Sequence, residues 1–150
     1  MTEKRRGFVS DAPLADVTYQ VIGLAMATHN ELGPGYREVV YHTALAYKLS
    51  EAGLHFEVEP YVSVTLPDGS VVGGACPDLL VEEDLIVELK AHTYAMTPGE
   101  AAQVISYFAA FERATVALYL NFGHERLEFR RLFPPRALQT FKTDKSKPKG

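Results

Sequence analysis

Apolar residues recur at helical spacing along two segments near the start of the chain. Residues 16–31 carry them on one helical face, and residues 37–52 carry a second such stripe. Gly33-Pro34-Gly35 separates the two segments. Glycine accepts the left-handed conformation that ends many helices, and proline cannot continue one. We therefore expect the chain to open with two helices.

The pattern then changes to an alternation with period two, which is typical of strands. Pro67-Asp68-Gly69-Ser70 is expected to form a turn, because proline presets φ and glycine accepts a positive φ. Glu82-Glu83-Asp84 is expected to form a second turn. Gly73-Gly74 indicates a bulge or a close approach of another group. The expected strands are residues 56–66, 71–81 and 85–91.

A helix start follows at Thr97-Pro98-Gly99-Glu100. Threonine at the N-cap, proline at the first helical position and glutamate at the third form a capping box, which predicts a helix over residues 98–112. Residues 115–122 and 126–132 are two further expected strands. The order ααβββαββ predicts an α/β (α+β) domain around one mixed sheet.

The short turn at residues 82–84 sets the register of the two strands that flank it. If Val81 and Leu85 close the hairpin, Asp78 lies opposite Glu88. Directly opposed Cβ atoms are about 4.5–5.5 Å apart, so two carboxylates repel each other there unless something positive lies between them. Lys90 shares their face, because side chains alternate along a strand. The hairpin therefore gathers two carboxylates and one ammonium group.

Apolar residues on both faces of this hairpin indicate that the charges are covered. Leu80 and Ile86 share the face of Asp78 and Glu88, and buried charges need partners or a metal ion. Mg²⁺ prefers oxygen ligands and often combines one or two carboxylates with waters and phosphate oxygens, which suits phosphodiester hydrolysis. From the spacing alone, an ion-pair network within a sheet is the simpler explanation, and both remain open.

Length and cysteine content exclude several classes of protein. A chain of 150 residues is typical of one domain, and its single cysteine, Cys76, cannot form an internal disulfide or supply a Cys-based zinc or iron–sulfur site. Cys76 is expected to be a small core residue. No apolar run reaches bilayer-spanning length, and no apolar stretch follows the basic start, so we expect neither a membrane span nor a signal peptide. We expect a cytoplasmic protein with no membrane partner.

The charge is unevenly distributed. The net charge is −4, yet residues 1–6 carry +2 and residues 142–150 carry +3, which leaves −9 on the body. So acidic a body argues against strong non-specific binding of polyanions, since lysine and arginine supply most of that affinity. We expect residues 1–12 to be an N-terminal segment, residues 13–134 the domain, and residues 135–150 a basic flexible tail.

Two motifs carry a family resemblance. Pro77-Asp78, followed after nine residues by Glu88-Leu89-Lys90, resembles the PD-(D/E)XK signature of the restriction-endonuclease-like nucleases. Gly35 to Tyr41 reads as G-x-x-E-x-x-Y, and the chain from about residue 17 to residue 132 resembles the small bacterial and archaeal proteins of the GxxExxY family. The resemblance implies a restriction-endonuclease-like core, with a central mixed sheet flanked by helices.

The resemblance also implies roles for the matching residues. Asp78 and Glu88 would bind Mg²⁺ or Mn²⁺, with the Leu89 carbonyl as a candidate third ligand. Lys90 would position the water that attacks the phosphodiester. Glu38, on the second helix, would contact the metal, often through water.

Three further residues complete the expected site. Gln103 and Tyr107 resemble the Q-x-x-x-Y helix of RecB-type nucleases, whose side chains help to hold substrate or the active-site shell. Tyr41 belongs to the G-x-x-E-x-x-Y motif, although its helical spacing is more typical of the core. His92, at a strand end, is expected in solvent, with a role as a base or phosphate ligand as the alternative.

The expected function is that of a Mg²⁺- or Mn²⁺-dependent nuclease, with DNA favoured over RNA. One alternative is a nucleic-acid-binding or adaptor domain that keeps the nuclease fold without turnover. Another is a homodimeric junction-resolving endonuclease, and a partner protein is also compatible with the sequence.

Overall fold

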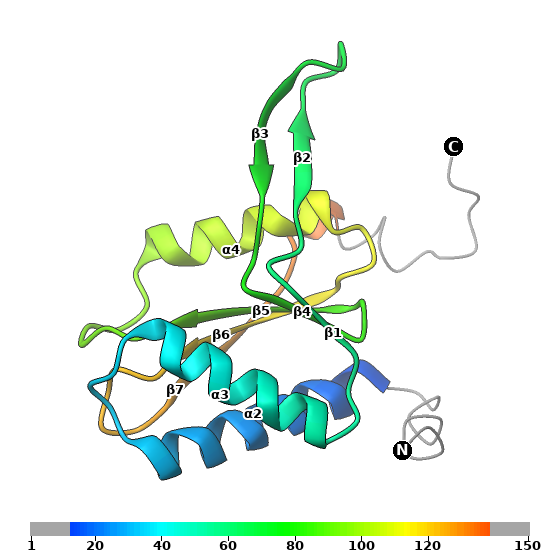
Figure 1. Cartoon of the computed structure of the whole chain (residues 1–150). Coiled ribbons are helices and arrows are strands. Elements are labelled where there is room, and N and C mark those ends of the chain that lie inside the picture. The colour runs from blue at the N-terminus through cyan, green and yellow to red at the C-terminus, as the bar shows by residue number, and fades with distance from the viewer. Residues whose placement is uncertain (1–12, 139–150) are drawn as a thin grey trace.

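The computed structural model describes residues 13–138, with side chains described from Asp16 onward (Figure 1). Residues 1–12 and most of the predicted basic tail lie outside the described residues. The helices are α2 (Pro13–Leu32), α3 (Glu38–Glu51) and α4 (Pro98–Ala110). The strands are β1 (Phe56–Val58), β2 (Val62–Thr65), β3 (Val71–Ala75), β4 (Leu79–Val81), β5 (Leu85–Lys90), β6 (Val116–Asn121) and β7 (Glu128–Leu132).

The three predicted helices are confirmed, together with their stop and start signals. Gly33 follows α2 with φ 72° and donates its N–H to the carbonyl of His29 at 2.7 Å. At the start of α4, the Thr97 side chain accepts from the Glu100 N–H, and the Glu100 side chain accepts from the Thr97 N–H. Local capping chemistry therefore sets these boundaries.

A five-stranded mixed sheet, in the order β1-β4-β5-β6-β7, forms the centre of the domain. Helices α2 and α3 pack on one face and α4 on the other, as Figure 1 shows. Because β4 and β5 are covered on both faces, every residue from Leu79 to Val81 and from Leu85 to Leu89 is buried. This confirms the mixed α/β fold and the expected cover over both faces of the hairpin.

Two of the predicted strands were wrong in extent, because each is broken at a proline. The stretch 56–66 divides into β1 and β2 around Pro60, and the stretch 71–81 divides into β3 and β4 around Pro77. Proline has no N–H for a sheet ladder. Glu59, before the first break, has φ 50° and donates its N–H to the carbonyl of Asp78 at 2.8 Å. The element order is therefore ααβββββαββ.

Strands β2 and β3 form a separate hairpin that stands away from the body (Figure 1). Gly69, in the predicted turn, has φ 90°. The expected irregularity at Gly73-Gly74 is confirmed, since the register shifts after Val64 and a side chain at Gly74 would collide with the ring of Tyr61. Most of the hairpin is exposed on both sides.

Cys76 is exposed, and its Sγ lies 3.4 Å from the carbonyl of Glu59. The expectation that it is a core residue was wrong, because the chain leaves the central sheet at Pro77 and Cys76 lies beyond that break. None of the helices within residues 13–138 combines the length and apolarity needed to cross a bilayer.

Candidate active site

Asp78 and Glu88 meet as the hairpin register predicts. Strands β4 and β5 pair antiparallel with Val81 opposite Leu85, and Asp78 immediately precedes β4. The Asp78 N–H donates to Oε1 of Glu88 at 3.2 Å. The prediction from the three-residue turn, that the two acidic residues lie together, is therefore confirmed.

The Asp78 carboxylate is held against the backbone of β5. Its Oδ2 accepts from the Leu89 N–H at 2.7 Å. The N–H and C=O of one strand residue point to the same side, so the Leu89 carbonyl faces Asp78 as well. Burial raises the pKa of Asp78, although the bond from Leu89 and the nearby charges of His42 and Lys90 oppose that rise.

Glu88 is the most strongly perturbed carboxylate of this cluster. It is only 5% exposed, at the centre of the sheet. Burial, and after it the charge of Asp78, raises its pKa to about 7. The Lys90 Nζ lies 3.7 Å from Oε2 of Glu88 and compensates only part of this cost. The cluster therefore holds more negative charge than its protein partners neutralise.

Glu38 is the first residue of α3 and approaches the cluster from the layer that α2 and α3 form. Its pKa is raised by burial and then by the charge of Asp78, while Lys90 lowers it. Tyr41, one turn later, is fully buried and stacks on Phe122 with ring centroids 4.7 Å apart. The structure thus places Glu38 within electrostatic reach of the other site residues and Tyr41 in the core.

The Tyr41 hydroxyl fixes the loop that leads to Glu38. It donates to the carbonyl of Gly33 at 2.6 Å and accepts from the Tyr36 N–H at 3.1 Å. These bonds tie both ends of the Gly33–Tyr36 loop to α3. The contacts of Tyr41 are therefore with this loop and with the core.

His42 is also a neighbour of the cluster, although it was not predicted as a site residue from the sequence. Its Nε2 lies 3.3 Å from the carbonyl oxygen of Asp78, and its charge lowers the pKa of both Asp78 and Glu38. His42 follows Glu38 by four residues on α3, so the two side chains share a helix face. That spacing was the signal that could have identified it.

Helix α4 places one of its two expected residues beside the carboxylates. Tyr107 is buried, and burial together with the charges of Glu88 and Asp78 raises its pKa to about 12. Gln103, one turn earlier, is exposed. Tyr107 therefore covers the cluster, while Gln103 lies at the surface on the same side of the helix.

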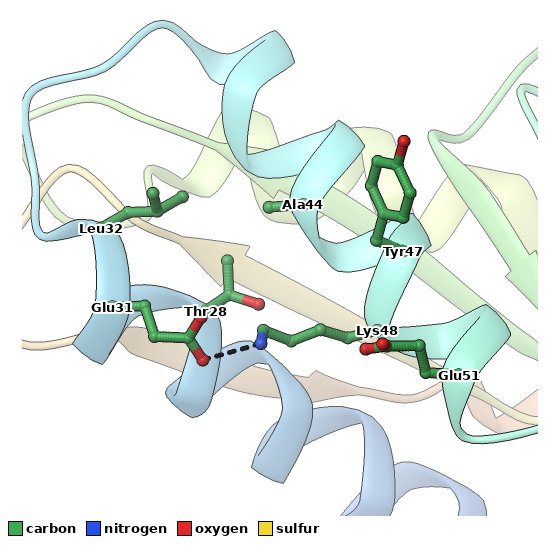
Figure 2. A pocket seen from close by; sticks show the side chains of 7 residues that line it. All are labelled: Thr28, Glu31, Leu32, Ala44, Tyr47, Lys48 and Glu51. Atoms are coloured by element: carbon green, nitrogen blue, oxygen red, sulfur yellow. Dashed lines mark hydrogen bonds and ion pairs between the residues drawn. The ribbon is translucent and has the colours of Figure 1, made fainter.

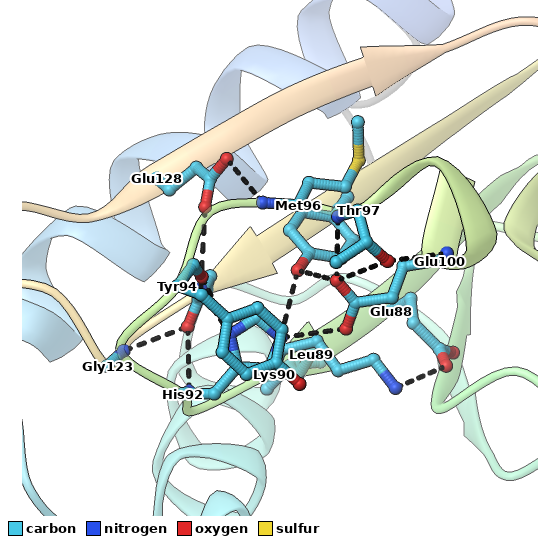
Figure 3. Close-up of polar contacts among 12 residues, drawn as sticks. Glu88, Leu89, Lys90, His92, Tyr94, Met96, Thr97, Glu100, Gly123 and Glu128 are labelled. Atoms are coloured by element: carbon cyan, nitrogen blue, oxygen red, sulfur yellow. Dashed lines mark hydrogen bonds and ion pairs between the residues drawn. The ribbon is translucent and has the colours of Figure 1, made fainter.

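A second polar network lies beside Lys90, where β5 and β6 end next to each other (Figure 3). Nε2 of His92 contacts Oε2 of Glu100 at 2.7 Å, and the Tyr119 hydroxyl donates to Oε1 of Glu100 at 3.0 Å. The expectation that His92 lies in solvent was wrong, because its side chain is only 18% exposed. Partial burial raises the pKa of Glu100, but hydrogen bonds from Thr97, His92 and Tyr119 outweigh it and leave the pKa low.

Asn121 is the centre of this second network. It is fully buried, and its Oδ1 accepts from the N–H groups of His92 at 3.1 Å and Gly123 at 3.0 Å. Its Nδ2 donates to the carbonyl of Tyr94 at 3.0 Å. A side chain at Gly123 would collide with the backbone of His92. Asn121 therefore fastens the segment after Lys90 to the end of β6.

Glu128 extends the network to β7. Its carboxylate accepts from the Met96 N–H at 3.1 Å and lies 3.2 Å from Nε2 of His124. The segment between β5 and α4 is consequently anchored to both β6 and β7.

The carboxylate cluster has the chemistry of a site for a hard divalent cation. Within residues 13–138, no three or more His, Cys, Asp or Glu side chains are already arranged as a metal site. However, Asp78 and Glu88 offer two adjoining carboxylates with uncompensated charge, and Mg²⁺ needs only one or two carboxylates when waters complete its shell. The residues present therefore fit such an ion.

A shallow pocket of about 380 Å³ lies elsewhere, between α2 and α3 (Figure 2). An ion pair of 2.7 Å between Lys48 and Glu31 crosses it. None of the expected site residues lines this pocket, so it is separate from the carboxylate cluster.

The comparisons with known proteins agree with this geometry at the level of the family. The sequence profile of the PD-(D/E)XK nuclease superfamily matches residues 15–132, and the chain belongs to this superfamily. Its members generally use divalent metals. No curated protein matches the chain.

One similar solved structure is described as the crystal structure of SSO0001. It is 18% identical, with a TM-score of 0.46, and the alignment covers 69% of this chain. The chain spans only 53% of the length of that protein.

Proposed function

We propose that this protein is a divalent-metal-dependent nuclease that hydrolyses phosphodiester bonds of nucleic acid, with DNA the favoured substrate. The observation that carries this proposal is the pairing of Asp78 with a buried Glu88 beside the amine of Lys90. Membership of a nuclease superfamily supports the same reaction class. The narrower resemblance to the GxxExxY family supports including Glu38 in the site.

Each residue has a task that follows from its chemistry. Asp78, Glu88 and the Leu89 carbonyl would hold Mg²⁺ or Mn²⁺, and Glu38 would contact it directly or through water. When bound, such an ion lowers the pKa of coordinated water and neutralises charge developing on the phosphate. The Lys90 ammonium, beside Glu88, orients the attacking water and stabilises negative charge in the transition state.

The surroundings support this chemistry. Tyr107 and the apolar side chains of α4 limit the access of bulk water to Glu88, which strengthens electrostatic interactions there. A cytoplasmic location is part of the proposal, because the exposed thiol of Cys76 is compatible with a reducing compartment.

A binding or adaptor domain without turnover is the second candidate. It is favoured by the ion pair between Lys90 and Glu88, which partly neutralises the cluster without any metal.

A homodimer would be favoured by the exposed valines of the β2–β3 hairpin, and sedimentation of the intact chain distinguishes it from a monomer.

A cleavage panel tests the proposal. Labelled single-stranded and double-stranded DNA and RNA are incubated with the protein and Mn²⁺, Mg²⁺ or a chelator. We expect metal-dependent cleavage that falls by roughly 10²–10³-fold or more in Asp78→Asn and in Lys90→Met.

The ion pair between Glu31 and Lys48 offers matched controls. Glu31→Gln and Lys48→Met remove the same types of charge far from the cluster and should leave cleavage unchanged. Cleavage that survives in purified Lys90→Met at the wild-type rate would contradict the proposed mechanism.

A further inference from the structure

Tyr94 presents an exposed aromatic ring four residues after Lys90. The residue is 56% exposed, although the segment that carries it is anchored to the sheet. The ring stacks on the imidazole of His92, with centroids 3.6 Å apart and the planes 7° from parallel. Figure 3 shows this stack beside the strand that carries Glu88 and Lys90.

The backbone below this ring is held in place. The Tyr94 carbonyl accepts from Nδ2 of Asn121 at 3.0 Å and lies 2.8 Å from Nδ1 of His92. His92 is itself held by Glu100 at 2.7 Å. A ring fixed in this way loses little conformational freedom when a flat ligand binds to it.

The stack also lies close to the proposed reaction centre. The charge of His92 acts on the carboxylate of Glu38, which places the imidazole within electrostatic reach of the cluster. His92 covers one face of the Tyr94 ring and leaves the exposed part of the side chain accessible. A nucleotide whose phosphate reached Lys90 would therefore have its base or a neighbouring base near this ring.

Charge alone gives this protein a weak hold on nucleic acid. The chain has a net charge of −4, so general attraction for phosphates is small. Stacking on an aromatic side chain is independent of that charge and contributes to binding at each base it engages. Bases within a duplex are already stacked on their neighbours, whereas unpaired bases can turn out onto a protein ring.

We propose that Tyr94, supported by His92, is a stacking platform for an unpaired base, and that the protein selects single-stranded or frayed nucleic acid. This inference rests on the proposed function, because it specifies the substrate class of the same site. Tyr94 is a binding residue in this proposal, and the chemistry remains with Asp78, Glu88 and Lys90.

The test measures binding separately from cleavage. A short single-stranded DNA carrying 2-aminopurine, whose fluorescence falls when it stacks on an aromatic ring, is titrated with the full chain in chelator. The same strand annealed to its complement is measured in parallel. We expect quenching and tighter binding for the single strand than for the duplex.

The variants identify the ring responsible. Tyr94→Phe should retain quenching, whereas Tyr94→Ala and Tyr94→Leu should weaken binding of the single strand roughly 5- to 100-fold. Tyr47→Ala is the matched control, since Tyr47 is 71% exposed on α3 and lines the separate pocket. Thermal unfolding of each variant confirms that the fold is intact.

The outcomes distinguish the two proposals. Single-strand binding by Tyr94→Ala or Tyr94→Leu at wild-type affinity overturns the platform, as does equal binding of duplex and single strand by the wild type. Metal-dependent cleavage in either of those cases would leave the nuclease proposal standing. Binding that depends on Tyr94, without cleavage of any substrate in Mn²⁺, would support the platform and reject the nuclease.

Discussion

Two polar clusters flank Lys90, and they are electrostatically opposite. In the first, burial raises the pKa of Asp78 and of Glu88, and the Lys90 amine, 3.7 Å from Glu88, together with backbone N–H groups and His42, compensates only in part. In the second, Asn121 is fully buried with its amide oxygen and nitrogen both hydrogen-bonded. The first cluster has uncompensated negative charge, whereas the buried amide of the second cluster has its hydrogen-bond partners.

This difference indicates which cluster has a function and which cluster supports the structure. A satisfied buried network rigidifies the structure, whereas unpaired buried charge lowers stability and persists where a ligand can relieve it. We therefore assign binding and catalysis to the first cluster, and to the second the positioning of the segment between β5 and α4.

Breaking the satisfied network should cost the most stability. Asn121→Ala leaves the N–H groups of His92 and Gly123 without their acceptor. We expect the free energy of unfolding to fall by about 2–4 kcal/mol in urea titrations. Asn30→Ala, at an exposed position of α2, is the control and should change stability little. An Asn121→Ala protein as stable as the wild type would refute the structural role.

Neutralising a carboxylate of the first cluster should instead increase the free energy of unfolding. The pKa of Glu88 is about 7 in the folded protein, above its ordinary value of 4.5. The folded state therefore holds more protons between these values, and stability falls as pH rises through this window. Glu88→Gln should make the metal-free protein more stable at pH 8 by about 1–3 kcal/mol.

Glu100 supplies the contrasting control within the second network. Its pKa is lowered by hydrogen bonds despite partial burial, so its carboxylate stabilises the fold above its unfolded pKa, and that contribution is lost as pH falls. Glu100→Gln should therefore destabilise the protein at pH 8. If Glu88→Gln and Glu100→Gln changed the free energy of unfolding in the same direction in denaturant titrations, the proposed difference between the clusters would be refuted.

Adding metal should stabilise the first cluster alone. We expect Mn²⁺ at 100 times its dissociation constant to increase the stability of the wild type by about 2.7 kcal/mol, because it binds only the folded site. Asp78→Asn should lose most of this gain, which calorimetry can measure. An equal gain in wild type and Asp78→Asn would place the ion elsewhere.

The smallest effect is expected at the edge of the first cluster. His42→Ala removes the imidazole that lies 3.3 Å from the Asp78 carbonyl. We expect the cleavage rate to fall roughly 3- to 10-fold, the value of about one hydrogen bond. His55, which is exposed, provides the matched control His55→Ala. A rate equal to wild type in His42→Ala would show that this contact does not position Asp78.

The first cluster was more accessible to sequence reasoning than the second. Its two carboxylates are joined by one tight turn, so counting residues was enough to pair Asp78 with Glu88. Pro60 and Pro77 carry a signal for the strand breaks, but the alternating pattern around them predicts continuous strands. The second network could not be predicted, because His92, Glu100 and Asn121 meet only through the packing of separate elements.

The two pairings of β5 imply an order of events during folding. Its partner β4 is three residues away along the chain, whereas Ile86 pairs with Ala117 of β6 only after the α4 crossover is in place. Local contacts form faster than distant ones. The acidic pair should therefore assemble in an early hairpin, before the Asn121 network exists, and we expect divalent cations to speed refolding by screening that repulsion.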